Sequence, residues 1–216
     1  MKAFNFFILY RFPIGIVLLL GGIALGFTVG WWEASLVLLL AVICLVTHVL
    51  FGPMRMVQEA VEAGDLERAN KLMNQIKWPN LLYKPIRSVY YFMQSNMAMY
   101  TNDLDKAEST IRQSIKSGSP MKEYEGMQYF QLGNIAYQKN DLKSADQNLK
   151  KAVRMGLPDK ENTAAALLTL SGIAMSRREF KSAKDYFRRA KAQKPTNDQI
   201  VSQIKEMEKH ISRLPG

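Results

Sequence analysis

The sequence predicts an all-α protein in which a two-helix transmembrane hairpin precedes an α-solenoid of about four helix-turn-helix units and a C-terminal capping helix. Two apolar runs at 13–29 and 34–51, neither with an acidic residue, Lys or Arg, predict the hairpin. Small and apolar residues that recur at one constant interval predict the solenoid. An apolar stripe at helical spacing near the C-terminus predicts the cap.

We expect four parts along the chain. Residues 1–12 form an interfacial N-terminal segment, and residues 13–52 form the hairpin, with helices at 13–29 and 34–51. Residues 53–196 form the four units, at about 53–79, 86–119, 124–158 and 162–195. Residues 197–216 form the capping helix and tail, with Ile200, Ile204, Met207 and Ile211 on one stripe.

Composition limits the chemistry that the chain can perform. It has 216 residues, one cysteine and two histidines, so an intrachain disulfide and a histidine-rich metal site are both excluded. The sequence contains no phosphate loop, GxSxG, HExxH or paired-cysteine motif. We therefore expect no enzyme activity, no cofactor and no metal.

The first 51 residues have the composition of a membrane anchor. The segment 1–12 combines aromatic side chains with Lys2 and Arg11, a mixture typical of the membrane–water interface. Each apolar run that follows approaches the length of about 20 residues that spans a bilayer core as a helix. Since only Gly30–Glu33 separate the runs, the two helices must be antiparallel neighbours. A cleaved signal peptide is the alternative, but Gly-Trp-Trp-Glu offers no small-x-small cleavage site and a second apolar run follows at once.

The distribution of basic residues predicts the orientation of the hairpin. Lys2 and Arg11 precede it and Arg55 follows it, whereas the connecting loop carries Glu33 and no basic residue. The positive-inside rule then places both ends in the cytoplasm. We expect an integral protein of a bacterial inner (cytoplasmic) membrane, with a cytoplasmic N-terminus and solenoid.

Three glycines recur at every fourth position in and after the first apolar run. Gly22, Gly26 and Gly30 share one helix face, which permits close helix approach. That face packs either against the second helix of the same hairpin or against a second copy of the chain in a dimer.

The repeat is defined by three sets of residues in one register. One alanine recurs as Ala69, Ala107, Ala145 and Ala183, and another as Ala60, Ala98, Ala136 and Ala174. The turns between the helices recur as Gly64-Asp65, Asn102-Asp103, Asn140-Asp141 and Arg178-Glu179. Asp141 is a good N-cap for the helix that it precedes. One unit cannot bury its apolar face alone, so at least three must stack.

Residues 126–158 resemble a tetratricopeptide repeat. The resemblance rests on Leu132-Gly133, the turn Asn140-Asp141, Ala145, Ala152 and Pro158. It extends over about 54–196 and is clear again at 164–195, where Phe180, Ala183, Phe187, Ala190 and Pro195 match. The interval from Ala107 to Ala145 is longer than the usual repeat of the family, which has about 34 residues. The resemblance implies helical hairpins stacked into a solenoid that binds a protein partner on its concave face.

In this family the first helices of the units line the concave face. The resemblance therefore implies a groove at residues of the two middle units: Phe92, Asn96, Met99, Met127, Phe130, Asn134 and Tyr137. Asn96 and Asn134 are separated by one full repeat, and an amide side chain can both donate to and accept from a peptide backbone. Alternatively, the aromatic residues pack between neighbouring units.

Basic residues concentrate near the C-terminal end of the solenoid. Residues 143–194 hold 13 Lys and Arg against 5 Asp and Glu. Seven of these form a basic patch: Arg177, Arg178, Lys181, Lys184, Arg188, Arg189 and Lys191. The patch is either an ordinary solvated surface or a contact for anionic lipid. Nucleic acid is not expected, because no recognition motif accompanies the charge.

The sequence thus leads to two functional hypotheses. The first is a membrane-anchored scaffold or adaptor that binds a protein partner in the concave groove of a cytoplasmic solenoid. The second is an accessory or assembly subunit of a larger membrane complex that contacts its partners through the hairpin.

Overall fold

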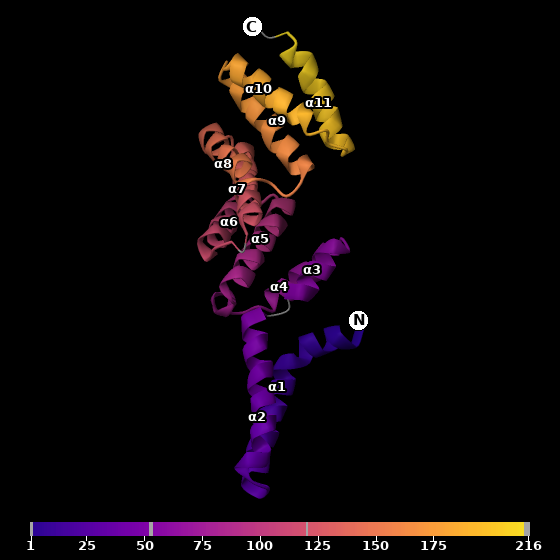
Figure 1. Ribbon diagram of the computed structural model, residues 1–216, viewed down its shortest axis with the longest axis vertical. Helices are drawn as coiled ribbons and strands as arrows, with labels where there is room; N and C mark the ends of the chain where they lie inside the picture. Colours follow the sequence, from indigo (N-terminus) through magenta and orange to yellow (C-terminus); the bar gives the residue numbers. More distant parts are fainter. Residues whose placement is uncertain (1, 52–53, 120, 214–216) are drawn as a thin grey trace. The chain divides into compact units, whose positions relative to one another are not determined.

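A computed structural model describes residues 2–51, 54–119 and 121–213 (Figure 1), and all of its regular structure there is helical. The α-helices are α1 (Lys2–Thr28), α2 (Trp31–Phe51), α3 (Met54–Glu62), α4 (Leu66–Asn74), α5 (Lys84–Tyr100), α6 (Leu104–Ser117), α7 (Lys122–Gln138), α8 (Leu142–Met155), α9 (Lys160–Ser176), α10 (Phe180–Ala192) and α11 (Asp198–Ile211). A short 3-10 helix, η1, covers Pro79–Leu81.

The helices pack in sequence-adjacent pairs, as the all-α fold class predicts. The pairs are α1 with α2, α3 with α4, α7 with α8 and α9 with α10. The chain divides into two compact units, residues 1–90 and residues 91–216. The division falls inside α5.

In the first unit, α1 and α2 form a hairpin of two long apolar helices. Segments Tyr10–Thr28 and Trp31–His48 are long and apolar enough to cross a membrane, and both leave most of their surface uncovered. We expected a separate segment before Pro13, but α1 is one helix from Lys2 and contains this proline. The helix bends in Figure 1, as helices do at an internal proline that removes a hydrogen bond. The expected boundary at 52–53 lies outside the described residues.

Also in the first unit, α3 and α4 pack against each other. Val57 and Ala60 on α3 are buried, as are Ala69 and Met73 on α4. These residues include the alanines of the two recurring sets that the sequence defines.

The turns between paired helices repeat in structure as well as in sequence. Their first residues, which are equally spaced along the chain, all have left-handed backbone: Gly64 at φ 74°, Asn102 at 57°, Asn140 at 61° and Arg178 at 60°. Glycine and asparagine adopt this conformation more readily than other residues. The next residue then donates its amide to the recurring alanine near the end of the previous helix, as Asp141 does to the carbonyl of Ala136 at 2.9 Å.

The aspartates of these turns cap the second helices. Asp65, Asp103 and Asp141 each accept a hydrogen bond from the backbone amide of the third residue that follows, at Arg68, Lys106 and Ser144. The N-cap predicted at Asp141 is therefore confirmed. Glu179 occupies the fourth such position, and its longer side chain makes no capping bond.

Small residues let the two helices of a pair approach closely. At Gly133 on α7, an added methyl group would lie 2.7 Å from Leu149 Cγ on α8. The same position is Ser95 in the preceding unit and Ser171 in the following one, and both are fully buried. Their hydroxyls donate to the carbonyls of Ala107 and Ala183 at 2.8 Å, so the serines pair with the neighbouring helix without unsatisfied polar atoms.

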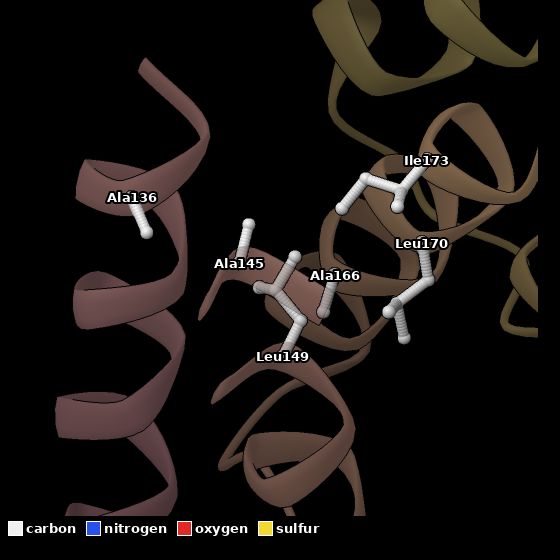
Figure 2. Close-up of a cluster of buried hydrophobic side chains, with 6 residues drawn as sticks. All are labelled: Ala136, Ala145, Leu149, Ala166, Leu170 and Ile173. Carbon is white, nitrogen blue, oxygen red and sulfur yellow. The ribbon is translucent and has the colours of Figure 1, made fainter. Parts of the chain in front are cut away.

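The apolar core of the second unit continues from one helical pair to the next. Figure 2 shows Ala136, Ala145 and Leu149 facing Ala166, Leu170 and Ile173. The first three come from α7 and α8, and the others from α9. A single pair therefore does not bury its own apolar surface, as expected of a solenoid.

Helix α11 covers the last pair. Its residues Ile204 and Ile211 are buried in one cluster with Leu167, Leu168 and Phe187, and Ile200 and Met207 pack on this cluster. The apolar stripe predicted from the sequence thus faces the core. Glu161 on α9 holds the start of this helix, accepting hydrogen bonds from the amide and hydroxyl of Thr196 at 2.7 and 3.0 Å. Residues 214–216 of the predicted capping helix and tail lie outside the described residues.

Candidate partner-binding surface

Three of the residues expected in the groove contribute to packing between pairs. Phe92 and Met99 on α5 pack against a cluster that contains Ala98, Ile111 and Leu132. Phe130 on α7 packs against the cluster shown in Figure 2, which joins its own pair to α9. The aromatic residues therefore serve the core at least in part, which is the alternative that the sequence left open.

The two asparagines differ from the aromatic residues in having side chains that the protein itself does not use. Asn96 on α5 and Asn134 on α7 are half-buried. Within the described part of the chain, neither side-chain amide forms a hydrogen bond with the protein. A half-buried amide that has no internal partner is available to a ligand, since it can donate and accept at the same time.

Tyr137 lies one helical turn after Asn134 and is 45 % exposed. Both side chains come from α7, and side chains at positions i and i+3 share a helix face. Met127, two turns before Asn134, is half-buried. This face of α7 thus carries an amide, a phenol and a thioether that are all at least partly accessible.

Gly172 belongs to the same surface, and sequence reasoning missed it. It lies on α9, one full repeat after Asn134, at the position that the asparagines occupy in the preceding units. Among the described residues, a methyl group added there would have only the Tyr137 hydroxyl within 4.0 Å. The missing side chain leaves the edge of Tyr137 open, and the series Asn96, Asn134, Gly172 was the signal that could have identified it.

Tyr124 is a second residue that sequence reasoning missed. Its ring lies 5.3 Å from that of Phe92, centroid to centroid. Its hydroxyl is buried and has no hydrogen-bond partner among the described residues. Burial raises the pKa of this phenol, so it stays a neutral donor at physiological pH.

Ion pairs join the pairs α7–α8 and α9–α10 each to the pair before it. Lys139, at the end of α7, contacts Asp105 and Glu108 of α6 at 2.7 Å each. One unit later, Arg177 contacts Asp146 of α8 at 3.4 Å and donates to the carbonyl of Leu142 at 2.9 Å. Arg177 of the expected basic patch therefore has a structural role.

Several residues of the basic patch form ion pairs at the surface. Arg188 and Arg189 both contact Asp185, at 2.8 and 3.8 Å, and Lys191 contacts Glu208 of α11 at 2.6 Å. Lys184 also takes part in a side-chain interaction. Arg178 and Lys181 are exposed. Surface charge that is partly paired in this way does not by itself indicate an anionic ligand.

The glycine face of the hairpin is occupied by the hairpin itself. A methyl group added at Gly22 would lie 2.7 Å from Leu38 Cδ2, and one at Gly26 would lie 2.7 Å from the ring of Trp31. Gly30 takes a φ of 145° in the turn between the helices. The close approach predicted from the spacing of these residues is therefore made between α1 and α2.

Two comparisons complete the description of the site. The family model of the tetratricopeptide repeat matches residues 129–155, which cover most of α7 and all of α8. No curated protein matched the chain. In the described part of the chain, no group of three or more His, Cys, Asp or Glu side chains is placed to hold a metal ion. Residues 129–155 thus carry a tetratricopeptide repeat, which supports this family for the chain and protein–protein interaction as its general role.

Proposed function

We propose that the protein is a membrane-anchored scaffold that binds a protein partner on the surface formed by Asn96, Asn134 and Tyr137. The observation that carries the proposal is the pair of half-buried amides with no partner inside the described part of the protein. Leaving such groups unpaired is unfavourable, and a bound backbone would satisfy them. The division into four units at about 53–79, 86–119, 124–158 and 162–195 is part of the same proposal.

The exposed surface of the hairpin supports the membrane anchor. Large apolar side chains on both helices project outward, among them Val17, Phe27 and Leu36, which are 68 %, 77 % and 70 % exposed. A core helix of a soluble protein would bury such groups, whereas lipid would cover them. A signal peptide supplies one apolar helix, and here two pack together. The charge asymmetry then favours a cytoplasmic solenoid in a bacterial inner membrane.

The chemistry of the surface favours a peptide segment as the ligand. Two amides on neighbouring helical pairs can bind successive backbone groups of one chain. The exposed ring of Tyr137 and the thioethers of Met99 and Met127 offer adaptable apolar contacts beside them. This combination of backbone recognition and apolar side-chain contacts is typical of peptide grooves.

Photo-crosslinking tests the surface in native membranes. A photoreactive residue replaces Tyr137 in the full-length chain, and a matched one replaces Ala192, which is exposed on α10. We expect a discrete protein crosslink from position 137 and none from position 192. The double variant Asn96→Ala/Asn134→Ala should lose the crosslink at 137.

A steric variant tests the same surface without removing a contact. Gly172→Gln starts a side chain next to Tyr137, since an added Cβ would meet only the Tyr137 hydroxyl, at 4.0 Å, among the described residues. Glutamine also favours the helix more than glycine does, so the fold should persist. The proposal predicts loss of the crosslink with unchanged helicity, and an undiminished crosslink in both this variant and the double variant would contradict it.

The same experiment addresses the second hypothesis, an accessory subunit that uses the hairpin. Gly22 and Gly26 face α2, so a partner would have to contact the outward side chains such as Leu36. Crosslinks that arise from position 36 but never from position 137 would replace the scaffold proposal by this one.

A further inference from the structure

A short segment of the first unit exposes three large apolar side chains. Trp78, Leu81 and Tyr83 are 69 %, 55 % and 55 % exposed, whereas Leu82 between them is buried. A cluster of this kind on a protein surface marks a contact with another apolar phase or partner.

The segment has a defined conformation that fixes these side chains. Pro79–Leu81 form the 3-10 helix η1, and Leu82 closes it by donating its amide to the carbonyl of Pro79 at 3.2 Å. Arg87 on α5 donates to the carbonyl of Asn80 at 2.9 Å. The buried side chain of Leu82 anchors the segment from within. The three apolar groups are therefore presented by an ordered loop.

The charged residues that flank the segment in sequence are basic, although Lys71 is paired with Glu67 at 2.8 Å. Residues 68–102 contain no Asp or Glu and five basic residues: Arg68, Lys71, Lys77, Lys84 and Arg87. Lys77 and Lys84 bracket the apolar cluster and are exposed, and neither forms an ion pair within the part of the chain that the structure describes. A second protein surface would not require this one-sided charge, whereas an anionic leaflet attracts it.

We propose that residues 77–84 form a second membrane contact, seated in the headgroup region of an anionic bilayer. Tryptophan and tyrosine flanked by lysine is the composition that favours the membrane–water interface. The segment also belongs to the same compact unit as the hairpin. This inference rests on the proposed membrane anchor. It adds that the first unit contacts the bilayer at two places, which restricts its rotation about the hairpin.

Tryptophan fluorescence tests the contact in the full-length protein. The chain has three tryptophans, so the variant Trp31→Phe/Trp32→Phe leaves Trp78 as the reporter. This variant is reconstituted into vesicles of phosphatidylcholine and phosphatidylglycerol, with lipids brominated at a shallow acyl position as quenchers. We expect blue-shifted emission, quenching by the brominated lipid and protection from aqueous iodide. Quenching should weaken in vesicles without phosphatidylglycerol, and also in Lys77→Gln/Lys84→Gln.

Two control variants separate this contact from the anchor itself. Trp78→Phe leaves Trp31 and Trp32, which report insertion of the hairpin. Met121→Trp, added to a chain without the other tryptophans, reports an exposed position of the second unit. Suppose that brominated lipid quenches the hairpin tryptophans. If iodide then quenches Trp78, or if neither quencher reaches Trp78, the lipid contact alone is overturned. The second of those results would indicate a protein covering the segment. Unquenched Trp31 and Trp32 would overturn the anchor, and this inference with it.

Discussion

The Nζ atom of Lys139 lies 2.7 Å from Glu108 Oε2, and this pair connects the end of α7 to α6 of the preceding unit. Arg177 and Asp146 occupy the equivalent two positions of the following units and lie 3.4 Å apart. The contact between units therefore repeats with the same period as the alanines and the turns. Glu108 also accepts from Arg112 at 2.8 Å, which holds the carboxylate in place.

The pair at Glu108 should make stability depend on pH. Hydrogen bonds from Lys139 and then from Arg112 lower the pKa of this carboxyl below its ordinary value of 4.5. A lowered folded-state pKa contributes stability that is complete above the ordinary value and is lost as pH falls through the folded one. We expect Glu108→Gln to lower the unfolding midpoint of the detergent-solubilised chain at neutral pH, and the difference from wild type to close on acidification.

Glu206→Gln is the matched control for this effect. Glu206 is exposed on α11 and forms no ion pair within the described part of the chain. Its replacement removes the same charge, so the midpoint should change little at either pH. A Glu108→Gln difference that persists unchanged at low pH would show that the ion pair is not its source.

Two glycine-to-alanine changes, one on α7 and one on α9, should have opposite effects. At Gly126 on α7, an added methyl group would overlap the carbonyl oxygen of Gly156 and lie 3.2 Å from its carbonyl carbon. Backbone cannot yield as a side chain can, so Gly126→Ala should destabilise by about 1–3 kcal/mol. Gly172→Ala on α9 meets no atom closer than 4.0 Å and should stabilise by up to about 1 kcal/mol through helix propensity.

Denaturant unfolding monitored by circular dichroism measures both variants against wild type. Equal stability of Gly126→Ala and Gly172→Ala would mean that the start of α7 and the end of α8 can move apart at no cost. The close approach at Gly126 would then not be a constraint on the fold.

Shortening Glu179 by one methylene group should stabilise the N-terminal end of α10. Asp65, Asp103 and Asp141 cap their helices, but Glu179 at the fourth position makes no capping bond. Glu179→Asp restores the shorter side chain that reaches the first-turn amides, and a formed cap contributes roughly 0.5–1 kcal/mol. We expect slower amide hydrogen exchange at the start of α10. Glu206→Asp, the same shortening inside a helix, should bring no such protection.

The capping helix should stabilise the pair that it covers. Ile204 is buried among Leu168, Phe187 and Ile211. Ile204→Ala should cost about 2–4 kcal/mol of local stability, because it leaves a cavity in this cluster. Hydrogen exchange should accelerate in α9 and α10 more than in α6, since a solenoid transmits stability through neighbouring interfaces. Gln203→Ala, at an exposed position of the same helix, should leave both rates unchanged.

The candidate site was only partly predictable from the sequence. The repeat placed Asn96 and Asn134 at equivalent positions, because a period in sequence is also a period in structure. It could not separate Phe92 and Phe130, which pack between pairs, from Tyr137, which is exposed. It also passed over Gly172, since an absent side chain gives no chemical signal until its neighbours are known.

By itself, the sequence determined the helical pairs, their turns, the cap at Asp141 and the apolar stripe of α11. These features depend on local chemistry, namely left-handed turn residues, short acceptor side chains and helical periodicity. Only the tertiary structure decided which side chains remain free. In the structure, Arg177 contacts Asp146 and the glycine face of α1 packs against α2. The Asn134 side chain has no hydrogen-bond partner in the described part of the chain. The physical reason is that burial and pairing depend on what the neighbouring helix places opposite each residue, which no single repeat encodes.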